Sequence, residues 1–417
     1  MSAGAPVSER ITSLDVIRGF ALFGILVVNL AHFSNPVSVP AAPRIDSALD
    51  ASLAWLVAFA AQGKFYPLFA LLFGVGFALQ RERTTTATCV RRLLVLLVIG
   101  VLHGVFIWAG DILTAYALAG FLLLLVGNAA TRSLVLLAVI IAMLQLGLAL
   151  LMLANVSYAE PCLAGLPVAH CDDPGTIAMI DGMRMQRQAV EDLAAVAVQA
   201  YRDGSYLDAT IARAAEYFVM LGNLAFFGAQ ILFMFLLGAL LGRAGVFANP
   251  EAHRRSLTGM LLLMMLVAVP LSVHYANLTA DSAFRDFLGA RFAQGFAVNL
   301  VAGTLFALGY AAAITLALRT RAGKWLESLA PLGRLALSNY LLQSIVCTWL
   351  FYGHGLGMMR AEPGFAMEFL IALLLFGVQV AASHWWLRRF HFGPAEWAWR
   401  AVTYGRLPAF RRRAAFA

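Results

Sequence analysis

The feature that most constrains this chain is a series of long apolar runs without charged side chains. Three of them, Leu93–Trp108, Ile112–Val126 and Ser133–Ala154, contain no Asp, Glu, Lys or Arg. Each approaches the roughly 20 residues that an α-helix needs to cross about 30 Å of hydrocarbon. Only 12% of the 417 residues are charged, against about 25% in soluble domains. We therefore predict an all-α, polytopic transmembrane helical bundle.

The hydrophobic pattern predicts about ten membrane spans. They are expected at residues 14–34, 64–81, 91–109, 111–128, 132–154, 215–242, 256–276, 296–318, 332–353 and 366–388. The first run is long and lacks a cleavage site, so we expect a retained helix rather than a signal peptide. The spans divide the chain into an N-terminal transmembrane half, an outer loop, a C-terminal transmembrane half and a basic tail, at residues 1–154, 155–214, 215–390 and 391–417. A shorter apolar stretch, Ala48–Ala61, is expected to form an outer-face or half-buried helix.

The basic residues lie mainly at the ends of the apolar runs. With the N-terminus in the cytoplasm, most of the 30 lysines and arginines fall in cytoplasmic segments, which predicts an N-in, C-in protein of the bacterial cytoplasmic (inner) membrane. This placement accounts for the net charge of +8 without a nucleic-acid partner. The lipid bilayer is the expected partner, and the sequence leaves the oligomeric state open.

The long loop carries two cysteines nine positions apart, Cys162 and Cys171. In a non-cytoplasmic loop this spacing favours a disulfide over two free thiols. The adjacent His170 lacks enough partners for a metal site, so no metal is expected. The stretch Ile177–Tyr201 has the mixed acidic and basic pattern of a surface helix. We expect this helix in the outer loop.

Polar residues in the first span form one set of candidates for binding substrate or an acyl-coenzyme A. Asp15 and Arg18 are three positions apart and can pair on one helix face. Asn29 follows Arg18 by eleven positions, about 16 Å along the same stripe, and His32 comes three positions later. Charged groups in a span are functional candidates by default. The alternative is a structural Asp–Arg clasp.

His103 and Asp111 are the candidate catalytic residues. His103 lies about 16 Å beyond Arg92 along its helix, near the middle of the bilayer. Imidazole titrates near neutral pH and is the commonest general base. Asp111 sits in a short turn, where it orients His103, holds a substrate hydroxyl, or simply caps the next helix.

Two further spans carry candidate ligand-binding residues. Lys64 stands beside an aromatic residue, where it contacts a substrate or anchors the helix at the interface. Arg334 lies near a cytoplasmic end and suits a phosphate-bearing ligand such as the nucleotide of a coenzyme A thioester. Asn339 and Gln343 are four apart on the same helix, where they bind a ligand or a neighbouring helix.

Other patterns indicate structure. No phosphate-binding motif of the G-x-x-x-x-G-K-[ST] type occurs, so no nucleotide-binding motif is predicted. Gly74 and Gly76 lie inside a span, where small residues let helices approach closely. In the tail, Trp397 and Trp399 are interleaved with Arg400, a pattern typical of a helix in the membrane interface.

As a set, these motifs resemble the YeiB family, whose C-terminal region is known as domain of unknown function 418. The matching stretches run in order along nearly the whole chain: Ser13–Gly19, Phe69–Gly76, His103 with Gly110–Leu113, Gly333–Arg334 with Ser338–Tyr340, and Gly393–Pro394 through Tyr404–Gly405. The set is specific, whereas any single motif is weak.

That family is distantly similar to the transmembrane acyltransferases of the acyltransferase-3 and heparan glucosaminide N-acetyltransferase types. The similarity implies transfer of an acyl group, usually acetyl, from cytoplasmic acyl-coenzyme A to a hydroxyl or amine on an envelope sugar. Acyltransferase-3 proteins carry a histidine eleven positions after the first-helix arginine, whereas this chain has Asn29. Asparagine is not a base, so His103 is the first candidate for that role and His32 the second, with Asn29 or Asn339 as oxyanion donors. A small-molecule or lipid transporter and a non-catalytic scaffold remain as alternatives.

Overall fold

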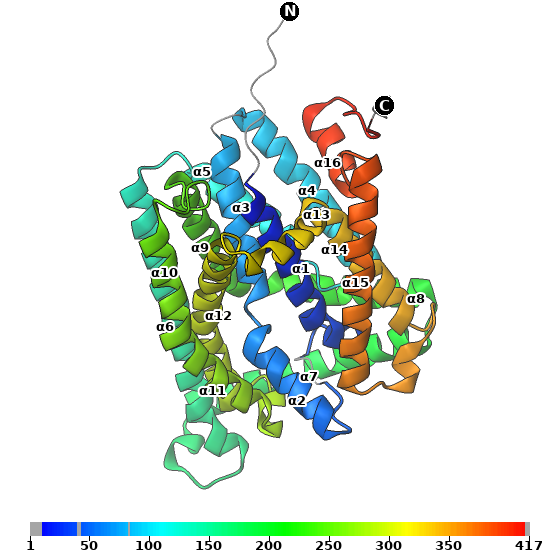
Figure 1. Cartoon of the computed structure of the whole chain (residues 1–417). Coiled ribbons are helices and arrows are strands. Elements are labelled where there is room, and N and C mark those ends of the chain that lie inside the picture. Colours follow the sequence, from blue (N-terminus) through cyan, green and yellow to red (C-terminus); the bar gives the residue numbers. More distant parts are fainter. Residues whose placement is uncertain (1–10, 40–42, 82–83, 413–417) are drawn as a thin grey trace, which may run out of the picture.

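The computed structural model describes residues 11–39, 43–81 and 84–412, so the last five residues of the predicted basic tail lie outside the described residues. Apart from one isolated bridge between Phe390 and Arg411, the described residues are helical or irregular. The α-helices, in chain order (Figure 1), are α1 Thr12–Phe33, α2 Ala48–Ala60, α3 Phe65–Arg81, α4 Thr86–Phe106, α5 Leu113–Val126, α6 Thr131–Leu163, α7 Pro174–Asp203, α8 Tyr206–Gly222, α9 Leu224–Arg243, α10 Arg254–Leu263, α11 Val269–Thr279, α12 Ala290–Ala317, α13 Ala330–Arg334, α14 Ala336–Phe351, α15 Phe365–Arg389 and α16 Pro394–Tyr404.

The predicted all-α transmembrane bundle is confirmed. Seven described helices are long and apolar enough to cross a membrane, or eight when the bent pair α8 and α9 is counted as one span. Two shorter apolar helices, α5 and α14, coincide with the fourth and ninth predicted spans. Each predicted span therefore has a helical counterpart, while the count of ten complete crossings stays a prediction.

The centre of the bundle is α1, which packs against α3, α13, α14 and α15. Its Val16, Ile17 and Leu22 are fully buried. The outer helix α6 behaves differently, because Leu136 is 61% exposed and Leu144 is 58% exposed. Leucines face outward at no cost when the surrounding medium is lipid. This is the surface of a multi-pass membrane protein.

Two predicted spans are interrupted. The sixth is bent by 64° between α8 and α9, where Asn223 ends one helix and precedes the next. The ninth breaks at Leu335, because the Glu396 carboxylate accepts hydrogen bonds from the backbone N–H groups of Leu337 and Ser338 and so begins α14 anew. Burial raises the pKa of Glu396, and its hydrogen bonds with Ser338 oppose that rise. The prediction of one continuous helix at either place is wrong.

The helix α5 has only 14 residues, about 21 Å of length, which is less than the hydrocarbon thickness. In the predicted topology a helix this short leaves the turn between α4 and α5 at membrane depth. Gly110, Asp111 and Ile112 are half-buried there, and the side chain of Asp111 is 0% exposed. Irregular backbone at membrane depth is tolerated where protein covers it. The short helix thus creates an internal polar turn.

The predicted helices in the outer segments are present. The surface helix of the loop is α7, and the half-buried apolar stretch is α2, which packs against α11 and α15. The structure forms the disulfide between Cys162 and Cys171, with Cα atoms 5.4 Å apart. It joins the last turn of α6 to the 3-10 helix η1 (Ala169–Asp172), and the segment between α6 and α7 lies at the bottom of Figure 1.

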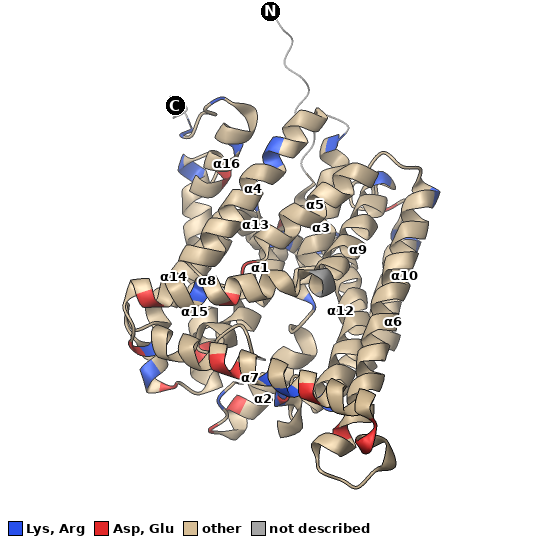
Figure 2. Ribbon diagram, turned by 180° about the vertical axis from the view of Figure 1, so that it is seen from behind, with Lys and Arg blue, Asp and Glu red and all other residues tan. Residues whose placement is uncertain are grey.

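The start of α1 and the helix α16 lie at the same end of the bundle (Figure 1). Figure 2 shows that the acidic residues gather mainly at the opposite end, near α2 and α7, whereas basic residues dominate around α16 and the start of α4. This distribution agrees with the positive-inside rule. The end that holds α16 is accordingly the predicted cytoplasmic end.

The most extensive helix contact joins α3 and α9 through glycines. A Cβ atom on Gly238 would overlap the carbonyl oxygen of Leu71 and would lie 3.0 Å from the Cα of Gly74. A Cβ on Gly74 would overlap the carbonyl oxygen of Phe235. This is the close approach that small residues allow in membrane helices.

We predict that Gly238→Ala destabilises the bundle by about 1–3 kcal/mol, the usual cost of overpacking. The measurement is reversible denaturation of the purified protein in mixed micelles. Gly377→Ala on α15 is the matched control, because a Cβ there meets nothing within 4 Å. Equal stability of the two variants would show that the glycine contact between α3 and α9 is not tight.

Candidate functional site

The two candidate catalytic residues meet inside the protein. The Nδ1 atom of His103 lies 2.9 Å from Oδ1 of Asp111, and the side chains are 1% and 0% exposed. The carboxylate holds one imidazole nitrogen and thereby fixes the ring orientation. The other nitrogen, Nε2, is buried and has no hydrogen-bond partner among the residues that the structure describes.

Local sequence explains why this pair forms. His103 is in the last turn of α4, and Asp111 follows after a short turn. The second carboxylate oxygen of Asp111 accepts a hydrogen bond of 2.8 Å from the backbone N–H of Thr114, in the first turn of α5. Gly100 leaves room, since a Cβ there would lie 2.9 Å from that same oxygen. Asp111 therefore both caps α5 and orients His103.

Helix α8 holds the end of α4 in place. The guanidinium of Arg213, which is 1% exposed, donates to the carbonyl oxygen of Ile107 at 2.8 Å. The hydroxyl of Tyr206 donates to the carbonyl oxygen of Phe106, also at 2.8 Å. A cation at a helix C-terminus is favoured by the helix dipole. These contacts position the helix turn that carries His103.

Aromatic groups surround the imidazole of His103. The Tyr340 ring lies 5.1 Å from it and the Trp108 ring 6.5 Å from it, measured between centroids. The hydroxyl groups of Thr114 and Tyr217 are 2.8 Å apart beside the Asp111 turn. The indole Nε1 of Trp108 is buried and has no hydrogen-bond partner among the described residues. A basic nitrogen and an N–H donor, both unsatisfied within the described chain, thus belong to neighbouring rings.

The first-span candidates lie on α1. Asp15 and Arg18 form the predicted ion pair, with Nη1 and Oδ1 3.0 Å apart. Arg18 is part-buried and approaches α3 at Gly76. Asn29 is half-buried, and His32 lies in the last turn with its Nδ1 buried and unpartnered among the described residues. The ligand roles of these residues stay predictions.

Asn339 and Gln343 face α15 and belong to a polar ladder between two helices. The Asn339 amide nitrogen donates to the carbonyl oxygen of Leu335 and to the hydroxyl of Ser383, at 3.1 Å each. The Gln343 amide nitrogen donates to Oε1 of Gln379 at 2.8 Å. Both amide hydrogens of Asn339 are therefore used within the protein. The half-buried Arg334 lies nearby, at the end of α13.

Lys64 occupies the break between α2 and α3. Its side chain is 0% exposed, so it does not reach the lipid–water interface as an anchoring lysine would. The ammonium donates to the carbonyl oxygen of Ala58 at 2.8 Å and to Oδ1 of Asn299 at 3.2 Å. It also lies 4.8 Å from the centre of the Tyr275 ring, a cation–π distance. Lys64 thus joins the helix break to α11 and α12.

Sequence reasoning missed two buried acids. Glu216 on α8 is fully buried and accepts hydrogen bonds from the hydroxyls of Ser38 and Tyr201, at 2.7 and 2.6 Å. Glu368 on α15 is 2% exposed. Both lie inside predicted spans. An acidic residue in a span is a functional candidate by default, and this rule could have identified them from the sequence.

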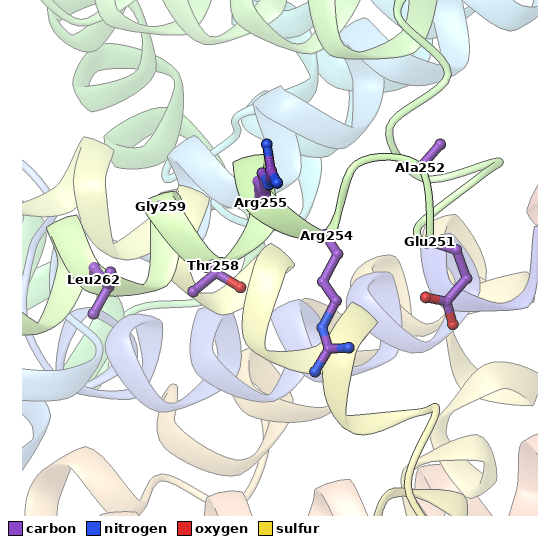
Figure 3. Close-up of a pocket in the computed structure, with 7 residues that line it drawn as sticks. All are labelled: Glu251, Ala252, Arg254, Arg255, Thr258, Gly259 and Leu262. Atoms are coloured by element: carbon purple, nitrogen blue, oxygen red, sulfur yellow. The ribbon is translucent and has the colours of Figure 1, made fainter.

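Two other features of the structure, a groove at α10 and a group of possible metal ligands, do not form a ligand site. A groove of about 620 Å³ surrounds the start of α10 and is lined in part by Arg254 and Arg255. Figure 3 shows these two side chains pointing in different directions, so they do not converge on one ligand. Cys162, His170 and Cys171 are close enough to share a metal ion, but the two sulfur atoms are bonded to each other.

We predict that Asp111→Ala lowers the free energy of unfolding by about 2–4 kcal/mol, because it removes a helix cap and leaves buried polar atoms unpaired. A double-mutant cycle with His103→Ala, followed by denaturation in mixed micelles, measures the coupling. The cost of Asp111→Ala should fall when His103 is absent. An equal cost in both backgrounds would show that the two side chains are not coupled.

Comparison with known proteins identifies the family to which this chain belongs. The model of the family described as "Protein of unknown function (DUF418)" matches residues 241–406. The Bacillus subtilis (strain 168) protein "Uncharacterized protein YxaH" is 34% identical over 95% of both chains. The Escherichia coli (strain K12) protein "Uncharacterized protein YeiB" is 33% identical over 95% of this chain and 96% of its own length. Because the similarity runs through nearly the whole chain, this membrane protein belongs to the DUF418 family that includes YeiB and YxaH.

Proposed function

We propose that the protein is a membrane acyltransferase that moves an acyl group, acetyl in the first instance, from acyl-coenzyme A to a hydroxyl or amine on the far side of the membrane. The observation that carries this proposal is the buried His103–Asp111 pair, whose Nε2 atom is unpartnered among the described residues. A carboxylate that holds Nδ1 leaves Nε2 as the nitrogen that takes up a proton. A purely structural histidine would be expected to use both nitrogens.

The proposed reaction uses this nitrogen twice. Nε2 of His103 removes the proton from the acceptor O–H or N–H as the acceptor attacks the thioester carbonyl. The Trp108 N–H, which is unpartnered among the described residues, donates to the oxyanion of the tetrahedral intermediate. The carbon–sulfur bond then breaks, and the coenzyme A thiolate takes the proton from His103. Trp108 replaces Asn339 as donor, because the Asn339 amide hydrogens are already used.

Basic residues at the predicted cytoplasmic end support a coenzyme A thioester as the acyl donor. Arg92 on α4 lies within electrostatic range of Arg18 and Arg400, and its guanidinium lies 4.4 Å from the Trp399 ring centre. Arg334 lies on α13, which packs against α1, the helix that carries Arg18. Guanidinium groups bind phosphate through paired hydrogen bonds. The coenzyme A phosphates would bind in this region.

We predict that His103→Ala reduces acyl transfer and thioester hydrolysis at least about 100-fold, the usual contribution of a general base. The assay follows release of free thiol from acetyl-coenzyme A by the protein in lipid vesicles. His253→Ala, which removes a histidine bonded to the carbonyl oxygen of Asn249 in the loop before α10, should keep full activity. Full activity in a folded His103→Ala protein would rule out this mechanism.

We predict that Arg334→Ala weakens binding of acetyl-coenzyme A about tenfold to a hundredfold, the loss of a hydrogen bond to a charged group. Calorimetry on the purified protein measures the dissociation constant. Arg255→Ala removes an exposed arginine from the groove at α10 and is the matched control. Binding that is equally weakened in both variants would indicate attraction by net charge alone, without a specific Arg334 contact.

A transporter is the second candidate, and broken helices favour it. The break at Lys64 and the 64° bend between α8 and α9 are features of transporters with discontinuous helices. Thiol release from acetyl-coenzyme A by sealed vesicles separates the two functions, because only an acyltransferase cleaves the thioester bond. Solute uptake without thioester cleavage would favour transport.

A further inference from the structure

A second polar pocket lies at the end of the bundle opposite α16. Its volume is about 210 Å³, below the roughly 300–1,000 Å³ of sites for drug-sized ligands, so it suits an occupant of monosaccharide size or smaller. The chain after α1, the end of α7, the 3-10 helix η5 (Met358–Ala361) and the first turns of α15 form its walls. Its polar lining consists of Ser34, Asn35, Arg44, Arg202, Glu362 and Glu368.

Glu368 is the buried acidic residue of this pocket. The side chain is 2% exposed, and its Oε2 atom has no hydrogen-bond partner in the part of the chain that the structure describes. Ser34, which directly follows α1, lines the same pocket. Glu368 is in the first turn of α15, where the helix dipole favours a negative charge. In its ionised form, a carboxylate this deeply buried is stabilised by a counter-ion.

The arginines at the rim of the pocket do not supply that counter-ion, because another acid binds them. Nη1 of Arg44 lies 3.0 Å from Oε2 of Glu362, and Nη1 of Arg202 lies 3.2 Å from Oε1 of the same residue. Glu362 has a φ of +46°, a backbone conformation that non-glycine residues rarely adopt and that often marks functional sites. The two arginines and Glu362 thus form the rim, and Glu368 remains as the charge below it.

Aromatic side chains pack between the pocket and the proposed catalytic pair. Phe33 precedes the pocket residue Ser34, and its ring lies 4.4 Å from the ring of Trp108. Trp108 in turn lies 6.5 Å from His103 between ring centroids. The pocket residue Met359 packs in the same apolar cluster as Phe33 and Trp108. Phe33 and Trp108 are only 1% and 2% exposed, so a ligand in the pocket would reach His103 only through movement of these packed side chains.

We propose that this pocket binds a small protonated amine that also carries hydroxyl groups, with Glu368 as the counter-ion of the ammonium. Ser34 and Asn35 contact the hydroxyl groups. The assignment of this amine as the acyl acceptor rests on the proposed function. The ammonium gives one proton to Glu368 as it leaves the pocket as a neutral amine, and its second N–H proton goes to His103 when the nitrogen attacks the thioester carbon.

The test compares two probes that differ at one position, D-glucosamine and D-glucose, by calorimetry on the full chain in lipid nanodiscs at neutral pH, without acetyl-coenzyme A. Glucosamine should bind at least tenfold more tightly than glucose. Glu368→Gln, which removes the charge and keeps the shape, should abolish that preference. Glu160→Gln removes an exposed acid near the end of α6 and should leave it unchanged.

Equal affinity of the wild-type protein for both sugars would overturn the proposal, and so would an unchanged preference in folded Glu368→Gln. If Glu368→Gln does not fold, Ser34→Ala takes its place, with a weaker affinity for glucosamine expected and an unchanged affinity counting against the site. Because no acyl donor is present, the result is independent of catalysis. Selective glucosamine binding without thioester cleavage would support the proposed amine site and contradict the proposed acyltransferase activity.

Discussion

The hydrogen bond between His103 and Asp111 is the interaction on which the centre of this structure depends. Polar groups inside a bilayer have no water to bond with, so the protein must satisfy them itself. One oxygen of Asp111 holds the imidazole and the other begins α5. The turn between α4 and α5 therefore stays inside the bundle, and the end of α4 is secured by Arg213 and Tyr206 from α8.

The same constraint explains most of the other polar residues in the spans. The Asn339–Ser383 and Gln343–Gln379 contacts join α14 to α15, and Lys64 joins a helix break to two neighbouring helices. Against this background, buried polar atoms without a partner in the described chain are informative. Three of them are His103 Nε2 and Trp108 Nε1 at the proposed catalytic pair and Glu368 Oε2 in the pocket at the end of the bundle opposite α16. We interpret these atoms as the places where substrate groups bind.

Much of the fold could be predicted from local sequence, and part of the site could not. Every predicted span has a helical counterpart, because long apolar runs leave a chain in lipid no alternative to helices. The breaks at Asn223 and Leu335 were not predictable, since the second depends on Glu396, 61 residues further along the chain. His103 and Asp111 were found because they are close in sequence and unusual in a span. Glu368 was missed, and its importance comes from residues of α7 and of the chain after α1 that surround it.

The sequence by itself determined that the chain is a helical membrane protein, where its helices lie and which few polar side chains enter them. These properties follow from hydrophobicity and helix length, which are local. Only the tertiary structure decided which polar groups are satisfied, because the partners of Glu216 and Lys64 come from distant segments. It also decided that the Asp111 side chain is buried, since His103 and Thr114 bind it and Tyr217 of α8 lies beside Thr114. Pairing across the fold thus separates structural polar residues from those available to a substrate.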